Sequence, residues 1–179
     1  MMQIAKPLDP VESLKGAYPN VVQDIHQFRN EITIIVAPKD VVTAARYLRD
    51  TSGLHYNYLS DISAVDYYPE YNRPGRFGVS YHLYSMLYSR RIRLKVFVQE
   101  DETVVPTMTV LWNAANWLER EIYDMMGIEF EGHPDMRRVL MPDDWNGHPH
   151  RRDYPLGYET VMFSFNYDQI SKHKPYAKE

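Results

Sequence analysis

The sequence of 179 residues predicts an α+β fold, a two-layer sandwich in which helices cover one face of a sheet. Segments with the two-residue alternation of strands and segments with helical spacing follow one another. Their order is helix, strand, strand, helix, strand, strand, strand, helix. Because the strands are grouped rather than alternating regularly with helices, a doubly wound parallel sheet is excluded. A long irregular segment, residues 128–179, follows the last helix, and we call it the C-terminal arm.

The N-terminal segment predicts a short helix followed by a hairpin. Residues 9–18 begin with Asp-Pro and carry apolar side chains at helical spacing, and the proline that follows ends the helix. Residues 20–28 alternate loosely, and residues 31–37 are rich in β-branched side chains, so both segments are predicted to be strands. Arg29-Asn30 between them is typical of a tight turn and predicts that the two strands pair.

The middle of the chain predicts a second helix and three further strands. The helix begins at Pro38, places its apolar residues on one face and ends at Gly53. Alternation then predicts strands within 56–67, 77–88 and 91–98, and the first two are separated by a segment rich in proline and glycine.

The strand over 91–98 has two unlike faces. Its even-numbered residues are all aliphatic, whereas Arg91, Arg93 and Lys95 lie on the opposite face. Three cations in a row are compatible with a ligand site, but they are typical of the solvated face of a sheet that is covered on one side only. We therefore expect this face to be open.

The last helix is predicted over residues 112–126, where apolar residues recur at steps of three and four, and Gly127 is placed to end it in the left-handed conformation. The C-terminal arm holds five of the twelve prolines and four of the seven histidines and has little periodicity. Its apolar side chains nevertheless require burial. We therefore predict an α+β domain over residues 1–127 and an extended arm over 128–179 that docks on a partner subunit.

Composition excludes several classes of protein. The absence of cysteine excludes disulfide frameworks, thiolate metal sites and iron–sulfur clusters held by cysteines. A net charge of −4 argues against a general nucleic-acid binder. No uncharged run is long enough to span a membrane, and the N-terminus lacks the apolar core of a signal peptide, so we expect a cytoplasmic chain.

Two groups of side chains in the sequence suggest catalysis. Asp144, His148 and His150 are of metal-ligand type and raise the alternative of a soluble metal-dependent hydrolase, although a third histidine at a recognised spacing is lacking. Glu121 and Asp124 can share a helix face and so suggest acid–base chemistry. Such carboxylates on helices are mostly solvated or paired, and we assign no catalytic residue.

The C-terminal arm contains two double-arginine steps, Arg137-Arg138 and Arg151-Arg152. The planar guanidinium group forms two parallel hydrogen bonds to a carboxylate, which suits recognition across an interface. Binding of phosphate or of acidic lipid is the alternative, and we favour docking onto acidic residues of a partner.

Residues 119–140, EREIYDMMGIEFEGHPDMRRVL, resemble the signature of the thirty-kilodalton subunit family of respiratory complex I, the C subunit of the NADH–quinone oxidoreductase. The sequel, MPDDWNGHPHRRDYPLGYE, is similar to the tail of that family. The resemblance implies that the signature positions are structural or interface residues and that none is catalytic. These positions are Glu119, Arg120, Glu121, Asp124, Gly127, His133, Pro134, Arg137, Arg138, Trp145, Arg151, Arg152, Asp153 and Tyr154.

The resemblance also implies a role. A family member is a non-catalytic scaffold of the peripheral arm of the proton-pumping complex, and it braces the large subunit, of the forty-nine-kilodalton type, near the quinone site. FMN and iron–sulfur clusters are then expected on partner subunits and no cofactor, metal, nucleic acid or small substrate on this chain. The chain is expected to lie peripherally at the cytoplasmic face of the inner membrane, in contact with the membrane arm only indirectly. Relatives of complex I, such as membrane-bound hydrogenases and ferredoxin- or F420-linked complexes, share the signature, so the electron donor and the quinone stay open.

Overall fold

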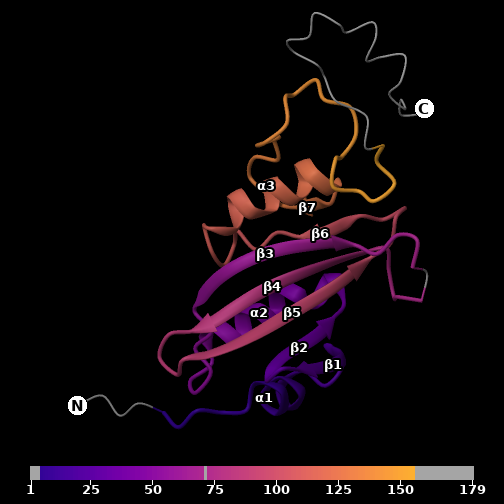
Figure 1. Cartoon of the computed structure of the whole chain (residues 1–179). Coiled ribbons are helices and arrows are strands. Elements are labelled where there is room, and N and C mark those ends of the chain that lie inside the picture. Colours follow the sequence, from indigo (N-terminus) through magenta and orange to yellow (C-terminus); the bar gives the residue numbers. More distant parts are fainter. Residues whose placement is uncertain (1–4, 71, 156–179) are drawn as a thin grey trace, which may run out of the picture.

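The computed structural model describes residues 5–70 and 72–155 and is built around a five-stranded sheet (Figure 1). Its strands are β1 (Val22–Phe28), β2 (Glu31–Val36), β3 (Tyr58–Asp66), β4 (Phe77–Ser85) and β5 (Arg90–Val98). They lie side by side in the order β1-β2-β5-β4-β3, and only β2 and β5 pair in parallel. The crossover from β2 to β5 therefore places the first hairpin beside the three later strands.

Helices and a second, small sheet complete the fold. The elements are α1 (Pro10–Ala17), the 3₁₀ turn η1 (Pro38–Asp40), α2 (Val41–Asp50), β6 (Val104–Pro106), α3 (Ala115–Met126) and β7 (Glu129–Glu131). Helix α2 lies behind β4 and β5 in Figure 1, whereas α3 lies beyond β3 at the end of the sheet. Strands β6 and β7 pair in parallel. The predicted α+β fold and the order of its longer elements are confirmed, but β6 and β7 were not predicted, and β7 lies in the C-terminal arm that was expected to be irregular.

The core lies between α2 and the sheet. The helix turns one face toward the sheet, and four of its side chains are fully buried there: Val41, Ala44, Ala45 and Leu48. The inward residues of β4 and β5 complete the layer, among them Val79, Leu83, Leu94 and Val96. Burial of this apolar layer is the main source of stability of the fold.

Several predicted element ends differ from the structure. Pro38 opens the 3₁₀ turn, and α2 begins three residues later and ends at Asp50, before Gly53. Helix α3 begins at Ala115 rather than at 112. Residues 111–116 form hydrogen-bonded turns in which the side chains follow one another at nearly helical spacing, so the apolar pattern extends beyond the start of the helix. The Arg29-Asn30 turn is confirmed, since both residues have the positive φ, 48° and 64°, that tight hairpin turns need.

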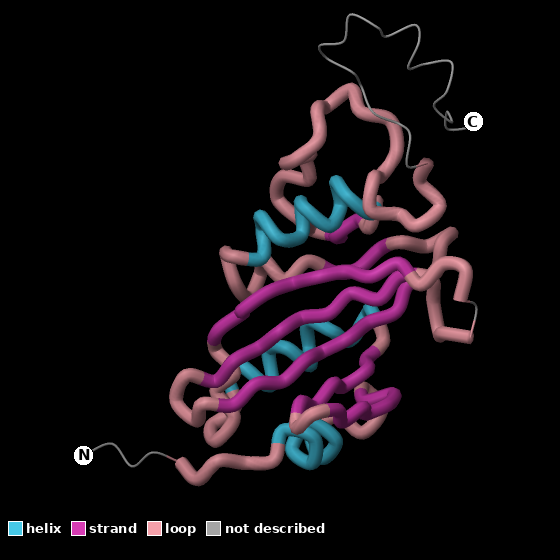
Figure 2. Tube along the Cα trace, in the orientation of Figure 1, coloured by secondary structure: helices cyan, strands magenta, loops and turns pink. Residues whose placement is uncertain are grey.

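The second face of the sheet is open, as predicted. Arg91, Arg93 and Lys95 are exposed or half-buried there, and they alternate with buried aliphatic residues of β5. Within residues 5–70 and 72–155 no helix covers this face (Figure 2). None of the helices in this part of the chain is long and apolar enough to cross a membrane.

The core continues past residue 127 into the C-terminal arm. Ile128 is fully buried and Phe130 is 4% exposed, and both belong to the main apolar cluster. The following segment, residues 132–155, has no helix or strand and lies against α3 (Figure 2). Residues 156–179 fall outside the described part of the chain, and docking of the arm on a partner stays a prediction.

Candidate functional site: the anchors of the C-terminal arm

Asp124, in the last turn of α3, is the centre of the first anchor that holds the C-terminal arm. Its carboxylate is fully buried. Oδ1 accepts Arg138 Nη1 at 2.6 Å, and Oδ2 accepts the backbone N–H groups of residues 139–141 at 2.7 to 3.0 Å. Burial by itself raises the pKa of Asp124. The N–H group of Met141, then Arg138 and the other two N–H groups outweigh burial, and the pKa lies below its ordinary value.

Arg138 joins the helix to the next turn of the C-terminal arm. Besides the carboxylate, Nη1 donates to the backbone carbonyl of Asp124 at 3.2 Å. Nη2 donates to the carbonyls of Trp145 and Gly147 at 3.0 and 3.1 Å. The fork geometry of arginine thus ties residues 138–147 into one loop around the end of α3.

The C-terminal arm also caps α3. The last carbonyls of a helix lack partners within the helix. Here His148 Nδ1 donates to the carbonyl of Asp124 at 3.0 Å, the N–H of His150 donates to Met125, and Arg151 Nε donates to Met126 at 2.7 Å. Since these donors come from outside the helix, the helix end and the arm depend on each other. Burial lowers the pKa of His148, which favours the neutral ring.

Gly127 makes this close approach possible. It ends α3 with φ of 70°, as predicted for a left-handed cap. A Cβ atom at this position would lie 2.5 Å from the guanidinium of Arg151 and from the His148 ring. The glycine is therefore required both by its backbone conformation and by the arm that lies over it.

A second anchor, centred on Asp66 at the end of β3, holds residues 152 and 153. Asp66 accepts Arg76 Nε and Nη2 at 3.1 and 2.9 Å and the backbone N–H of Arg152 at 2.9 Å. Arg76 Nη2 also donates to Asp153 at 2.7 Å, and Nη1 pairs with Glu100. The side chains of Asp66 and Arg76 are only 1% and 8% exposed, so water does not stabilise either charge and each charge depends on the other.

Glu119 forms a third buried centre, below the start of the C-terminal arm. Its carboxylate is fully buried and accepts Thr107 Oγ1 at 2.5 Å and the N–H of Met108 at 2.6 Å. Burial raises the pKa of Glu119 to about 7, although both hydrogen bonds oppose the shift. The buried His133 ring lies 4.0 Å away and accepts the N–H of Asp135 at Nδ1, so its Nε2 donates to the carbonyl of Asn116.

Arg120 connects the anchors to exposed apolar side chains on the surface. It donates to the carbonyls of Arg137 and Arg138 at 3.0 and 3.3 Å and lies over the Trp117 ring at 4.9 Å. Trp117 is 63% exposed and Leu140 is 58% exposed. We call Trp117, Arg120, Val139 and Leu140 the Trp117 patch.

The other predicted site residues have peripheral places. Glu121 and Pro134 are exposed. Arg137 is exposed and pairs through Nε and Nη2 with the two carboxylate oxygens of Asp135, at 2.7 Å each. Tyr154 donates to the carbonyl of Asn146 at 3.2 Å, and its ring packs on Gly147.

The structure does not support the catalytic alternatives. Glu121 is exposed whereas Asp124 is buried, so these two carboxylates do not face a common site. His148 uses Nδ1 on a backbone carbonyl. Across residues 5–70 and 72–155 no group of three His, Asp or Glu side chains could hold a metal ion, and the hydrolase alternative with Asp144 and His150 therefore lacks a site.

Sequence reasoning missed Asp66, Arg76 and Thr107. The one available signal for the first two was their position at the facing ends of neighbouring strands, on either side of the 67–75 loop. The local sequence does not indicate that this pair is buried, because the groups that cover it, Asp153 and the N–H of Arg152, come from far along the chain.

Comparison with known proteins identifies the family. The family model described as respiratory-chain NADH dehydrogenase, 30 Kd subunit, matches residues 34–160, which is more than half of this chain. The chain belongs to this family. The NADH-quinone oxidoreductase C subunit of Roseiflexus sp. (strain RS-1) is 47% identical, over 94% of this chain and 95% of the relative. The corresponding protein of Geobacter sulfurreducens is 46% identical, over 82% of this chain and 88% of the relative.

Solved structures agree with the membership in this family. A trypsin-resistant fragment (1-134) of Nqo5 is 34% identical and matches with a TM-score of 0.59, over 70% of this chain and 95% of that fragment. A chain of the membrane-bound sulfane sulfur reductase, an archaeal respiratory membrane complex, matches with a TM-score of 0.66 over 94% of both chains. At 21% identity the second likeness concerns the fold alone.

Proposed function

We propose that this family member is a non-catalytic scaffold in the peripheral arm of a proton-pumping NADH–quinone oxidoreductase. Its C-terminal arm braces the large subunit, of the forty-nine-kilodalton type, next to the quinone site. FMN and the iron–sulfur clusters then lie on partner subunits, and the chain is held peripherally at the cytoplasmic face of the inner membrane. Family membership supports the complex, and the anchors of the arm support the bracing role.

The observation that carries the proposal is the contrast between the anchors and the Trp117 patch. Three buried carboxylates, Asp66, Glu119 and Asp124, fix the described part of the C-terminal arm or the turns beside it. The same segment leaves Leu140 exposed, close in sequence to the Arg138 carbonyl that Arg120 binds. Tryptophan and arginine are the side chains that often dominate interface energies, and here an exposed Trp117 lies beside a half-buried Arg120 on a rigid support.

A pull-down from gently solubilised membranes of the native cell tests this function. The tagged chain is compared with Trp117→Ala/Leu140→Ala and with the control Met86→Ala/Leu87→Ala. The control pair is also exposed, at 61% and 50%, but lies in the turn between β4 and β5, far from α3 (Figure 1). Each variant removes exposed apolar surface, so thermal stability is expected to change little.

We expect cluster-bearing and membrane subunits to co-purify with the wild type and the control, with NADH–quinone activity. With the Trp117 patch variant, the amount of large subunit that co-purifies should be at least tenfold lower than with the wild type. A ferredoxin-fed or hydrogenase set of subunits would keep the scaffold role but contradict the named reaction. A wild-type chain that purifies alone, or a patch variant that assembles like the control, would contradict the proposal.

A further inference from the structure

The open face of the sheet carries a row of cations along β5. Arg91, Arg93 and Lys95 lie on this face, opposite the buried aliphatic residues. Cross-strand pairing places them beside Tyr84, His82 and Ser80 of β4, in that order. Arg73, from the loop between β3 and β4, lines the same end of the face as Lys95. The cations therefore form a row along residues 91–95 of β5, and Arg73 stands near its Lys95 end.

Aromatic rings hold three of these cations in place. Arg91 lies over Tyr84 at 5.9 Å, Lys95 over Tyr67 and Phe97 at 4.9 Å each, and Arg73 over Tyr67 at 5.3 Å. Lys95 also donates to the Tyr67 hydroxyl at 2.5 Å. Cation–π contacts of this kind restrict long side chains before a ligand arrives, which lowers the entropy lost on binding.

The charges of this row are only partly balanced on the face itself. Arg93 pairs with Glu31 at 2.9 Å. For Arg91, Lys95 and Arg73, the described residues provide no carboxylate within ion-pair distance. Since the whole chain carries a net charge of −4, this row of cations contrasts with the rest of the molecule.

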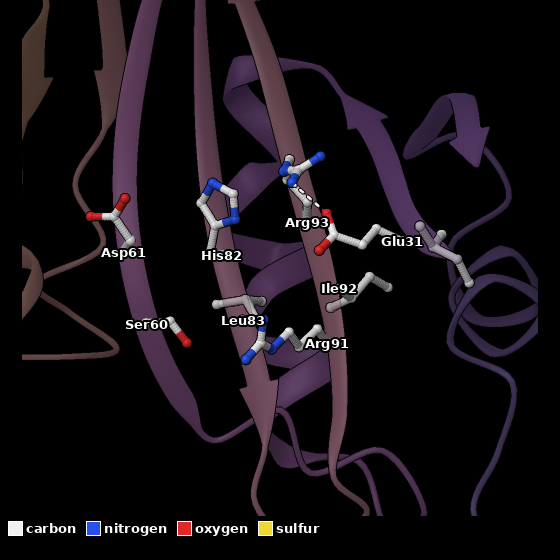
Figure 3. A pocket seen from close by; sticks show the side chains of 9 residues that line it. Glu31, Ser60, Asp61, His82, Leu83, Arg91, Ile92 and Arg93 are labelled. Carbon is white, nitrogen blue, oxygen red and sulfur yellow. Dashed lines mark hydrogen bonds and ion pairs between the residues drawn. The ribbon is translucent and has the colours of Figure 1, made fainter. Parts of the chain in front are cut away.

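Two adjoining grooves follow the row. The first, about 280 Å³, lies over β3, β4 and β5, where Asp61, His82 and Arg93 project side by side (Figure 3). The second, about 440 Å³, shares His82 and Arg93 with it and continues toward Lys95. Burial and then the charge of Arg93 lower the pKa of His82, which favours the neutral ring. Asp61 and Glu31 line the first groove together with the cations.

We propose that this face binds an extended acidic segment of a partner protein. Residues on one face of a strand repeat about every 6.7 Å, which is also the spacing of alternate side chains on an extended ligand. Carboxylates at alternate positions of such a segment face Arg91, Arg93 and Lys95. A nucleic acid, which carries a charge on every nucleotide, is disfavoured by the net charge of −4 of the whole chain, whereas a short acidic segment meets only the local row of cations, so a polypeptide is favoured.

Fluorescence anisotropy of the full chain tests this surface without the other subunits. The probe is a labelled octapeptide of alternating Thr and Glu, and a Thr-Lys octapeptide and an eight-nucleotide oligo-dT are the comparisons. The variant Arg91→Gln/Lys95→Gln is matched by Lys15→Gln/Lys39→Gln, which removes two exposed cations from α1 and η1. Arg91→Glu is the second variant, at an exposed position that folding does not require.

Wild type and control should bind the Thr-Glu peptide, weaker in high salt, and both Arg91 variants should bind at least tenfold more weakly. The Thr-Lys peptide should not bind. Absence of Thr-Glu binding, or equal binding by the Arg91 variants, would overturn the proposal. Tighter binding of oligo-dT through the same cations would also overturn it. None of these outcomes depends on the C-terminal arm, so the scaffold function is tested separately.

Discussion

Replacement of Asp124 by Asn should loosen the whole C-terminal arm. The amide keeps the shape of the carboxylate and keeps one oxygen for the N–H groups of residues 139–141. Its NH₂ group then faces Arg138, whose side chain is only 16% exposed. Leaving one partner of a buried pair without the other costs about 3 kcal/mol. Because a domain of this size is stable by roughly 5 to 15 kcal/mol, the variant should still fold.

Urea unfolding of the full chain measures this loss. With a slope of about 2 kcal/mol/M, a loss of about 3 kcal/mol lowers the midpoint by about 1.5 M. The control is Glu121→Gln on the same helix, at an exposed position, and it should change stability by less than about 0.5 kcal/mol. Equal midpoints for the Asp124 and Glu121 variants would refute the assignment of Asp124 as the central anchor.

Three further changes test the other anchors. The folded pKa of Glu119, about 7, exceeds its ordinary 4.5, so the free energy of unfolding of the wild type should fall by about 3 kcal/mol as the pH rises from 4.5 to 7. Glu119→Gln should remove that fall, seen in urea midpoints across pH. Gly127→Ala should cost about 3 kcal/mol in urea unfolding, and Gly132→Ala only about 1 kcal/mol. Arg76→Lys should cost about 2 kcal/mol, by thermal unfolding, because one ammonium cannot replace the fork on Asp66.

Each of these changes has an outcome that contradicts it. A wild-type pH profile as flat as that of Glu119→Gln would show that the buried carboxyl is not protonated in the folded chain. Gly132 also has a positive φ, 80°, but a Cβ atom there meets only Thr107 Cγ2 at 3.5 Å. Equal losses at Gly127 and Gly132 would therefore mean that the C-terminal arm does not lie close over the end of α3. An Arg76→Lys variant as stable as the wild type would remove Asp66 from the anchors.

Local patterns in the sequence predicted the order of the longer helices and strands and the open face, but not the short strands β6 and β7. The alternation along 91–98 distinguishes buried from exposed positions, and the glycine after α3 adopts the left-handed conformation that ends a helix. Patterns predicted the ends of elements less well. The turns around Trp112 place side chains much as a helix does, so side-chain spacing cannot distinguish them from helix.

Partners far apart in the chain could not be predicted in this way. Glu119 and Asp124 belong to the predicted signature, but their burial depends on Thr107 and on residues 138–141. Nothing near Asp66 in the sequence indicates that Arg152 will return to it. Two residues of the signature, Asp124 and Arg138, bind one another, whereas the patterning of the C-terminal arm suggested a segment that docks on a partner subunit.

Site-specific crosslinking tests the bracing role most directly. A photo-reactive amino acid replaces Trp117 in the tagged chain, in cells that assemble the complex, and a second one replaces Met86 as the control. Both positions are more than half exposed in the chain alone. We expect crosslinks from position 117 to the large subunit and none to that subunit from position 86. Assembled complex in which position 117 crosslinks only to water or to other subunits would contradict the bracing role.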